Sequence, residues 1–270
     1  MGIDARAIVD PGARLGERVR IGPWSIVGPD VEIGDDCEID AHVILRGPTR
    51  LGARNRISPF ASIGEGTPAL AYDGEPTTLV IGDDNTIREG VTLHRGTVQD
   101  RGETRIGDHN LFMPYVHVGH DSVVGDHCIF ANNASVSGHC RVGDFVVLSG
   151  YAGVPQFRSI GPHAFVGGMA LVTKDVPAFV KVAGHPARAV GLNVEGLRRR
   201  GFDGEAITRL REAWRIVYRS GLRLEAAIER LAVLDDPQGH VAALVASLRE
   251  ARQGIVRPRT AERGDPGADD

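Results

Sequence analysis

An aliphatic residue recurs at every sixth position near the start of the chain, and this spacing restricts the possible folds more than any other feature. The series has eleven consecutive matches, and Gly or Asp often follows the aliphatic residue. This is the hexapeptide signature of a parallel β-helix, in which three six-residue units make one coil that stacks on the next. The series is Ile3, Val9, Leu15, Ile21, Val27, Ile33, Ile39, Leu45, Leu51, Ile57 and Ile63.

The six-residue period continues beyond this series but is broken twice. It resumes in phase at Ile81, shifts by one residue, and then runs from Ile106 to Val172. The breaks, residues 64–79 and 97–105, carry Gly, Asp and Thr and show little periodicity, which indicates loops that leave the scaffold. The sequence therefore predicts a mainly β domain over residues 1–190 with two excursion loops.

The place of a residue in its unit predicts where its side chain points. The aliphatic residue and the small residue four places later are expected to face the interior, whereas the second to fourth places form the corners. Three cysteines occupy the inward fifth place and are interpreted as apolar core residues, and four histidines occupy the fourth, corner place and are most simply solvated. These are Cys37, Cys128 and Cys140, and His42, His109, His127 and His163.

A helical period replaces the six-residue period after Asp175. Apolar stripes at helical spacing predict three helices within residues 191–257, and Pro237 to Gly239 separate the last two. The tail, residues 258–270, has the composition of a disordered segment. The stripes are Ile207, Leu210, Trp214, Val217 and Tyr218; Leu224, Ile228 and Leu231; and Val241, Leu244, Val245 and Leu248.

Charge and hydropathy exclude several classes of protein. The chain has 31 Lys plus Arg and 35 Asp plus Glu, a net charge of −4, which excludes a globally basic nucleic-acid-binding protein. Residues 192–258 nevertheless hold twelve Arg against nine acidic residues, a surplus that suits either an acidic partner or a solvated helix surface. The N-terminus has no signal-peptide core and no apolar stretch reaches the length of a membrane span, so we expect a cytoplasmic protein.

The chemistry has to come from side chains placed on this scaffold, because β-helices serve enzymes and structural proteins alike. His120 and His139 are nineteen residues apart, one coil plus one residue, and are expected on the same edge of neighbouring coils about 5 Å apart. Asp121 is placed to orient the His120 imidazole, as in a general base for acyl transfer. A solvated surface pair is one alternative. A zinc site is another, with His117 and His120 at H-x2-H spacing.

Three motifs together resemble a known enzyme family. They are TLHRGT at 92–97, HNLFMPYVHVGHDSVVGDHCIFANNASVSGHCRVGDF at 109–145, and GLNVEGLRRRGF at 191–202. Over about residues 3–255 the chain resembles the UDP-N-acetylglucosamine O-acyltransferases of lipid A biosynthesis. The resemblance implies a left-handed parallel β-helix followed by a helical segment. It also implies transfer of a (3R)-hydroxyacyl group from acyl carrier protein to the 3-hydroxyl of UDP-N-acetylglucosamine.

The resemblance also implies roles for particular residues. His120 is implied as the general base, Asp121 as its orienting carboxylate and Gly138 as the N–H donor to the oxyanion. No metal is implied, and no cofactor beyond the phosphopantetheine of acyl carrier protein. Further residues are implied to bind the sugar and acyl carrier, namely His94, His117 and His139, or the nucleotide, namely Gln156, Asn193, Glu195, Arg199 and Arg200.

The family is a homotrimer with sites between subunits, so the resemblance implies that assembly here. The chain departs from the family at Ala69 and Ala71, where Asp and Lys are usual, and at Pro155, where His is usual. These departures leave two alternatives open: another UDP-sugar acceptor, such as an amino analogue, and a trimer that binds acyl carrier or nucleotide sugar without turnover. The acyl chain length is expected to depend on a cleft whose floor lies near Gly168 and Met169.

Overall fold

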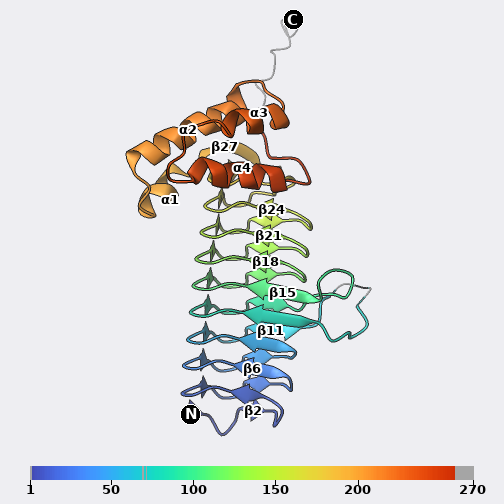
Figure 1. The fold of residues 1–270 in the computed structure, drawn as a ribbon. Helices are drawn as coiled ribbons and strands as arrows, with labels where there is room; N and C mark the ends of the chain where they lie inside the picture. Colours follow the sequence, from blue (N-terminus) through green and yellow to red (C-terminus); the bar gives the residue numbers. More distant parts are fainter. Residues whose placement is uncertain (1, 69, 71, 259–270) are drawn as a thin grey trace, which may run out of the picture.

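The computed structural model describes residues 2–68, 70 and 72–258. Strands β1 to β25 wind into a triangular prism that rises from the N-terminus to a cluster of helices at the other end (Figure 1). Each strand pairs in parallel with the strands one coil below and above it, so the prism has three flat sheets, named here faces A, B and C. The mainly β architecture expected from the six-residue period is therefore confirmed.

The strands of each face are short and regularly spaced. Face A contains β1 (Gly2–Ile3), β4 (Arg20–Ile21), β7 (Glu38–Ile39), β10 (Arg56–Ile57), β13 (Thr86–Ile87), β16 (Leu111–Phe112), β19 (Ile129–Phe130), β22 (Val147–Leu148) and β25 (Phe165–Val166). Face B contains β2 (Ile8–Val9), β5 (Ile26–Val27), β8 (Ile44–Leu45), β11 (Ser62–Glu65), β14 (Thr92–His94), β17 (His117–Val118), β20 (Ser135–Val136) and β23 (Gly153–Val154). Face C contains β3 (Arg14–Leu15), β6 (Val31–Ile33), β9 (Thr49–Leu51), β12 (Thr78–Ile81), β15 (Glu103–Ile106), β18 (Val123–Val124), β21 (Arg141–Val142) and β24 (Ser159–Ile160).

The strand register turns sequence spacing into vertical position. Residues eighteen apart stand one above the other, as Arg141 stands between Val123 and Ser159 on face C. The fourth place of the unit closes each corner in a left-handed backbone conformation, with φ of 57° at Asp121 and 61° at His139. Side chains at equivalent corner places therefore form ladders along the prism.

Both excursion loops leave the prism at the corner between faces B and C, called here the B–C corner, and project to the same side (Figure 1). They span residues 66–77 and 95–102, somewhat different from the expected 64–79 and 97–105, because β12 and β15 pair over four residues at the loop ends. Arg95 ties the loops together, since its guanidinium donates to Gly47 O at 2.8 Å and to Tyr72 Oη at 2.9 Å. Ala69 and Ala71 lie outside the described residues.

The far end of the prism is closed by a hairpin and four helices. The hairpin and the first helix were not expected from the sequence: the first helix is only six residues long and buries one side chain, Leu197, so it has no periodic stripe. The three expected stripes form the other helices. No described helix is long and apolar enough to cross a bilayer, and residues 259–270 of the expected disordered tail lie outside the description. The elements are β26 (Val180–Ala183), β27 (Arg188–Leu192), α1 (Val194–Arg199), α2 (Gly204–Arg219), α3 (Leu224–Leu231) and α4 (His240–Glu250).

The three cysteines lie in the prism core, as their inward places predict. Cys37, Cys128 and Cys140 are fully buried. Burial raises the thiol pKa of Cys128 to about 12 and that of Cys140 to about 11, and it also raises the pKa of Cys37. We therefore expect a thiol reagent to leave the folded protein unlabelled and to label all three cysteines in denaturant. Absorbance measures the labelling. Rapid labelling of the folded protein would contradict the placement of the cysteines in the core.

Candidate active site

His120 and Asp121 form a buried pair at the B–C corner, between β17 and β18. His120 Nδ1 lies 2.9 Å from Asp121 Oδ2, and the two residues are 8% and 1% exposed. Thr97 donates to the same carboxylate through its N–H at 3.0 Å and through its hydroxyl at 2.6 Å. A carboxylate beside Nδ1 favours the tautomer with the proton on Nδ1, which leaves Nε2 to accept one. The solvated alternative does not hold for this pair.

Gly138 stands one coil above His120 and lies against its imidazole. A Cβ on Gly138 would come within 2.5 Å of His120 Nε2, so a larger residue could not leave the ring in place. Gly138 occupies the third place of its unit, where the coil needs no N–H and where Pro29 and Pro114 stand in other units. Among the described residues nothing accepts the Gly138 N–H. The corner therefore has a free N–H donor beside the free nitrogen of a histidine.

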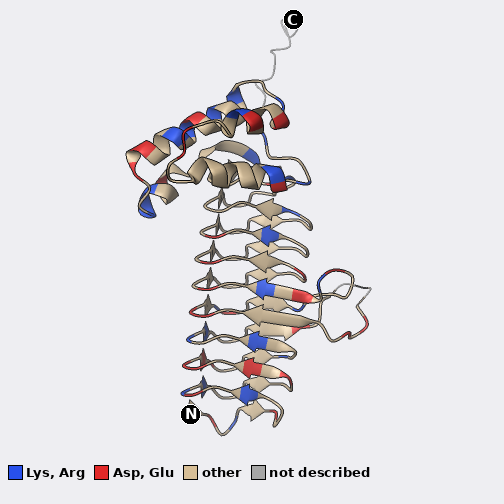
Figure 2. Cartoon of the chain, viewed as in Figure 1, with Lys and Arg blue, Asp and Glu red and all other residues tan. Residues whose placement is uncertain are grey.

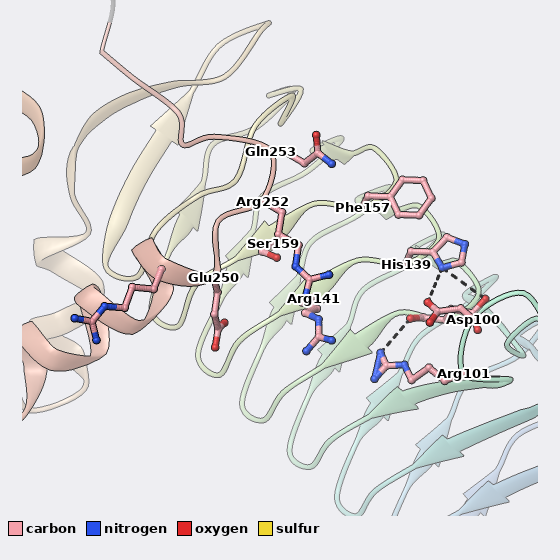
Figure 3. A pocket seen from close by; sticks show the side chains of 11 residues that line it. Asp100, Arg101, His139, Arg141, Phe157, Ser159, Glu250, Arg252 and Gln253 are labelled. Atoms are coloured by element: carbon pink, nitrogen blue, oxygen red, sulfur yellow. Dashed lines mark hydrogen bonds and ion pairs between the residues drawn. The ribbon is translucent and has the colours of Figure 1, made fainter. Parts of the chain in front are cut away.

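His139 has a carboxylate of its own, supplied by the 95–102 loop. Its Nδ1 lies 2.7 Å from Asp100 Oδ2 and 3.9 Å from Asp121 Oδ2 (Figure 3). The His139 ring stacks on Phe157 and meets His120 edge to face, with ring centroids 4.8 Å apart. The expected adjacency of His120 and His139 is therefore confirmed. Two imidazoles stand side by side, each with Nδ1 facing a carboxylate.

His94 and His117 lie on face B just below this pair and meet edge to face, with ring centroids 5.1 Å apart. Burial, followed by the neighbouring histidines, lowers the pKa of His94 to about 4, and burial and His120 lower the pKa of His117. Both rings are therefore neutral near pH 7. His117 Nδ1 lies 2.8 Å from Thr92 Oγ1, whereas His94 Nδ1 is buried without a partner among the described residues, so it can bind a polar group that enters the site.

The structure brings Gln156 to the same corner, two coils above His120 and one above Gly138. Gln156 is exposed, and its side chain makes no hydrogen bond to the described residues. The candidate ligand atoms of His120, Asp121 and His139 lie within 4.8 Å of one another, which would also suit a divalent metal. The same atoms already make two histidine–carboxylate contacts, which is the geometry of a base and its orienting group.

The remaining expected residues lie at a different corner of the same chain. Asn193, Glu195, Arg199 and Arg200 line a cavity of about 590 Å³ beside His163, where face C turns into face A. Asn193 caps α1 by accepting the Gly196 N–H at 3.2 Å, and its amide donates to His163 O at 3.0 Å. Two separate clusters therefore exist within one chain: the B–C corner cluster around His120, and this second cavity.

The two arginines of the second cavity differ in their contacts. Arg200 lies over the Phe145 ring at 4.6 Å, and Arg199 pairs with Glu195 at 3.0 Å. Both arginines are exposed, so they can reach an anion. His163 was expected to be a simply solvated corner residue, but it is half-buried in a stack between Phe145 and Phe179.

The stacked His163 should make the fold sensitive to acid. Burial, assisted by Arg200 and His240 and opposed by Asp144, lowers the pKa of His163 to about 4. The unfolded chain, with a histidine pKa of about 6.5, then binds more protons than the folded chain between these values, so this histidine lowers stability as pH falls from 6.5 towards 4. As pH falls over that range, we expect the melting temperature of His163→Gln to decrease less than that of wild type. A melting temperature of His163→Gln that decreases as steeply as that of wild type would contradict this. The control is His109→Gln, at an exposed histidine, which should behave like wild type.

Thr97 and Asp100 are the site residues that the sequence did not reveal. Both lie in the 95–102 loop, which has no periodicity from which a position can be derived. Thr97 is the last residue of the TLHRGT motif, and its place in this motif was the one sequence signal that could have indicated it.

Comparison with known proteins agrees with this geometry. The family described as UDP N-acetylglucosamine O-acyltransferase, domain 2, matches residues 175–256, and the bacterial transferase hexapeptide family matches residues 12–47 and 103–138. The acyl-[acyl-carrier-protein]–UDP-N-acetylglucosamine O-acyltransferases of Saccharophagus degradans and Stutzerimonas stutzeri are 55% and 57% identical to the chain, covering 94% of it and 99% of each relative. The chain belongs to the UDP-N-acetylglucosamine O-acyltransferase family. The resemblance inferred from the three motifs is therefore confirmed.

Solved members of the UDP-N-acetylglucosamine O-acyltransferase family share the whole architecture. LpxA from Acinetobacter baumannii superposes with a TM-score of 0.92 at 46% identity, covering 94% of this chain and 99% of that one. The Arabidopsis UDP-N-acetylglucosamine acyltransferase superposes with a TM-score of 0.79 at 33% identity, covering 94% and 99%. The coil is therefore the left-handed parallel β-helix of this family, as expected. Nothing in the comparisons favours an amino-sugar acceptor or a binding-only role.

Proposed function

We propose that this protein transfers a (3R)-hydroxyacyl group from acyl carrier protein to the 3-hydroxyl of UDP-N-acetylglucosamine, with His120 as general base. The observation that carries the proposal is the buried Asp121–His120 pair, whose Nε2 lies beside the free N–H of Gly138. The substrates are those named for relatives that match nearly the whole chain. Acyl transfer to a hydroxyl needs a base and an oxyanion donor side by side, and this corner has both.

The proposed reaction moves one proton out and back. His120 Nε2 takes the proton of the sugar hydroxyl while that oxygen bonds to the thioester carbonyl carbon, and the carbonyl oxygen becomes an oxyanion bound by the Gly138 N–H. Collapse of this intermediate breaks the carbon–sulfur bond, and His120 returns the proton to the leaving thiolate. Asp121 stabilises the transient imidazolium. The chain supplies every group in this scheme without a metal or a bound cofactor; the phosphopantetheine arrives with the donor.

A trimer would unite the two clusters of site residues. The B–C corner cluster and the second cavity lie at different corners of one prism, so the nucleotide held by one cavity would reach the base of a neighbouring chain. A row of exposed apolar side chains at the A-to-B corner supports contact with another chain, as Tyr115, Tyr151 and Met169 are 67%, 66% and 76% exposed. We therefore propose a homotrimer in the cytoplasm, where acyl carrier protein supplies the donor.

Removal of the Asp100 carboxylate should slow the proposed transfer without unfolding the protein. Asp100 is a positioning residue that acts through His139, so Asp100→Asn is expected to lower kcat by about tenfold, the value of one charge-assisted hydrogen bond. Glu103→Gln removes the same charge at the end of the same loop, where Glu103 pairs with Arg105, and should leave kcat unchanged. Equal rates for the two variants would show that Asp100 has no such role.

Mass spectrometry tests the proposed function directly. The protein is incubated with UDP-N-acetylglucosamine and a set of (3R)-hydroxyacyl carrier proteins, and the sugar nucleotide is analysed for an added acyl group. An O-acylated product, made fastest with one chain length, is expected. Absence of product from a folded trimer, or faster acylation of a different UDP-sugar, would overturn the proposed acceptor.

A further inference from the structure

A ladder of outward side chains runs up face C, and one arginine in it lacks a carboxylate. The lower arginines of the ladder are paired: Arg14 and Arg50 flank Glu32 and contact it, and Arg105 pairs with Glu103. Figure 2 shows basic and acidic segments on the strands of this face. Arg141 has Val123 below it and Ser159 above it. Among the described residues no carboxylate lies within 4.0 Å of its guanidinium. The arginine–carboxylate pairs that neutralise the charge of this ladder therefore do not include Arg141.

Arg141 faces a cavity of about 590 Å³ that begins at the candidate active site. The cavity reaches from Asp121 and His139 along face C to the segment after α4 (Figure 3). Four arginines line this cavity: Arg101, Arg141, Arg249 and Arg252. Of its three carboxylates, Asp100 and Asp121 contact histidines, whereas Glu250, at the end of α4, makes no ion pair among the described residues.

Arg252 is held in place by the prism. The Asp175 carboxylate accepts the Arg252 N–H at 2.9 Å and the neighbouring Gln253 N–H at 3.0 Å, and its other oxygen accepts the Ser159 N–H at 2.9 Å. The backbone of residues 252–253 is therefore fixed to the coil directly above Arg141. Neither Arg141 nor Arg252 makes an ion pair within the described part of the chain. Two guanidinium groups that face one cavity without an ion pair can together bind an anion that enters it.

We propose that Arg141 and Arg252 bind a phosphate group of a substrate while the reacting end of that substrate lies at His120. The inference rests on the proposed function, in which both substrates carry phosphate: the diphosphate of the sugar nucleotide and the phosphodiester of the donor arm. Guanidinium groups suit phosphate oxygens because their N–H donors match them in pairs. The cavity joins the base to this arginine pair, so a phosphate bound there holds the reacting group at the corner.

Kinetics of Arg141→Gln and Arg252→Gln identify which phosphate is bound. Each variant is expected to raise KM about tenfold for one substrate, with kcat and the other KM nearly unchanged, because one charge-assisted contact is lost. A raised KM for the acyl carrier assigns the cavity to the donor arm, and a raised KM for UDP-N-acetylglucosamine assigns it to the nucleotide. The matched control is Arg50→Gln, which removes a ladder arginine far from the site. Unchanged values of KM in both variants would overturn the proposal.

A binding measurement separates this inference from the proposed reaction. Calorimetry with phosphopantetheine and with UDP needs no turnover, so it remains informative if acyl transfer is not observed. Wild type and Arg50→Gln are expected to bind one of the two ligands about tenfold more tightly than Arg141→Gln and Arg252→Gln. Both substituted side chains are exposed, so the variants should fold. Equal affinities in all four proteins would show that the arginines bind neither phosphate.

Discussion

Replacement of His120 by alanine is expected to lower kcat for acyl transfer by about 10²- to 10⁴-fold, the usual contribution of a positioned general base. The expectation follows from the geometry: Asp121 binds Nδ1, so Nε2 is the one ring nitrogen that can take a proton from a hydroxyl. Substrate binding does not require the base, so KM should change much less than kcat. Initial rates with saturating donor and acceptor measure the effect.

His109→Ala is the matched control for His120→Ala. His109 is an exposed histidine stacked on His127, at the corner between faces C and A and not at the B–C corner of the candidate base. Its removal should leave kcat within about twofold of wild type because it contacts no site residue. A similar loss in both variants would point to damage to the coil, and a His120→Ala protein of undiminished kcat would exclude His120 as the base.

Replacement of Gly138 by alanine should be almost as damaging, for a steric reason. The added Cβ would come within 2.5 Å of His120 Nε2 and 2.6 Å of Cε1. The ring cannot simply rotate away because Asp121 holds its other side, so the base is displaced or the coils separate locally. A displacement of about 1 Å at a reacting atom costs on the order of 10²-fold in rate. We expect kcat to fall by about that amount while the melting temperature falls only slightly.

The control for Gly138→Ala is a glycine in an open position of the same scaffold. A Cβ at Gly28 would find its nearest neighbour, Leu45 O, at 3.4 Å, an ordinary contact. Gly28→Ala should therefore retain both its rate and its melting temperature. If Gly138→Ala kept its full rate, the close approach of Gly138 and His120 would not be part of the site.

The corner cluster was predictable where the coil sets the position. Spacing alone brought His139 beside His120. The family resemblance supplied Gly138 and Gln156, and the coil places them in one vertical row with His120. Thr97 and Asp100 were not predictable in this way. Their loop has no repeat, and its path depends on contacts such as that of Arg95 with Tyr72, which sequence does not reveal.

The second cavity shows a different limit of sequence reasoning. Asn193 and Arg200 belong to a motif whose family resemblance implied nucleotide binding, at sites that lie between subunits. Their place at the corner between faces C and A could not be derived from spacing, because the hairpin β26–β27 directs this part of the chain and has no six-residue repeat. One chain therefore contains two separate parts of the proposed site, which would be joined only in the proposed trimer.

Mixed oligomers test whether the base of one chain acts with the second cavity of another. His120→Ala lacks the base, and Arg200→Ala lacks an arginine of the second cavity, so each protein alone should transfer acyl groups poorly. When the two are unfolded together in equal amounts and refolded, about a quarter of the sites in a symmetric oligomer should combine an intact base with an intact cavity. We expect acyl transfer at about that fraction of the wild-type rate. A refolded mixture no more active than the average of its two components would contradict it.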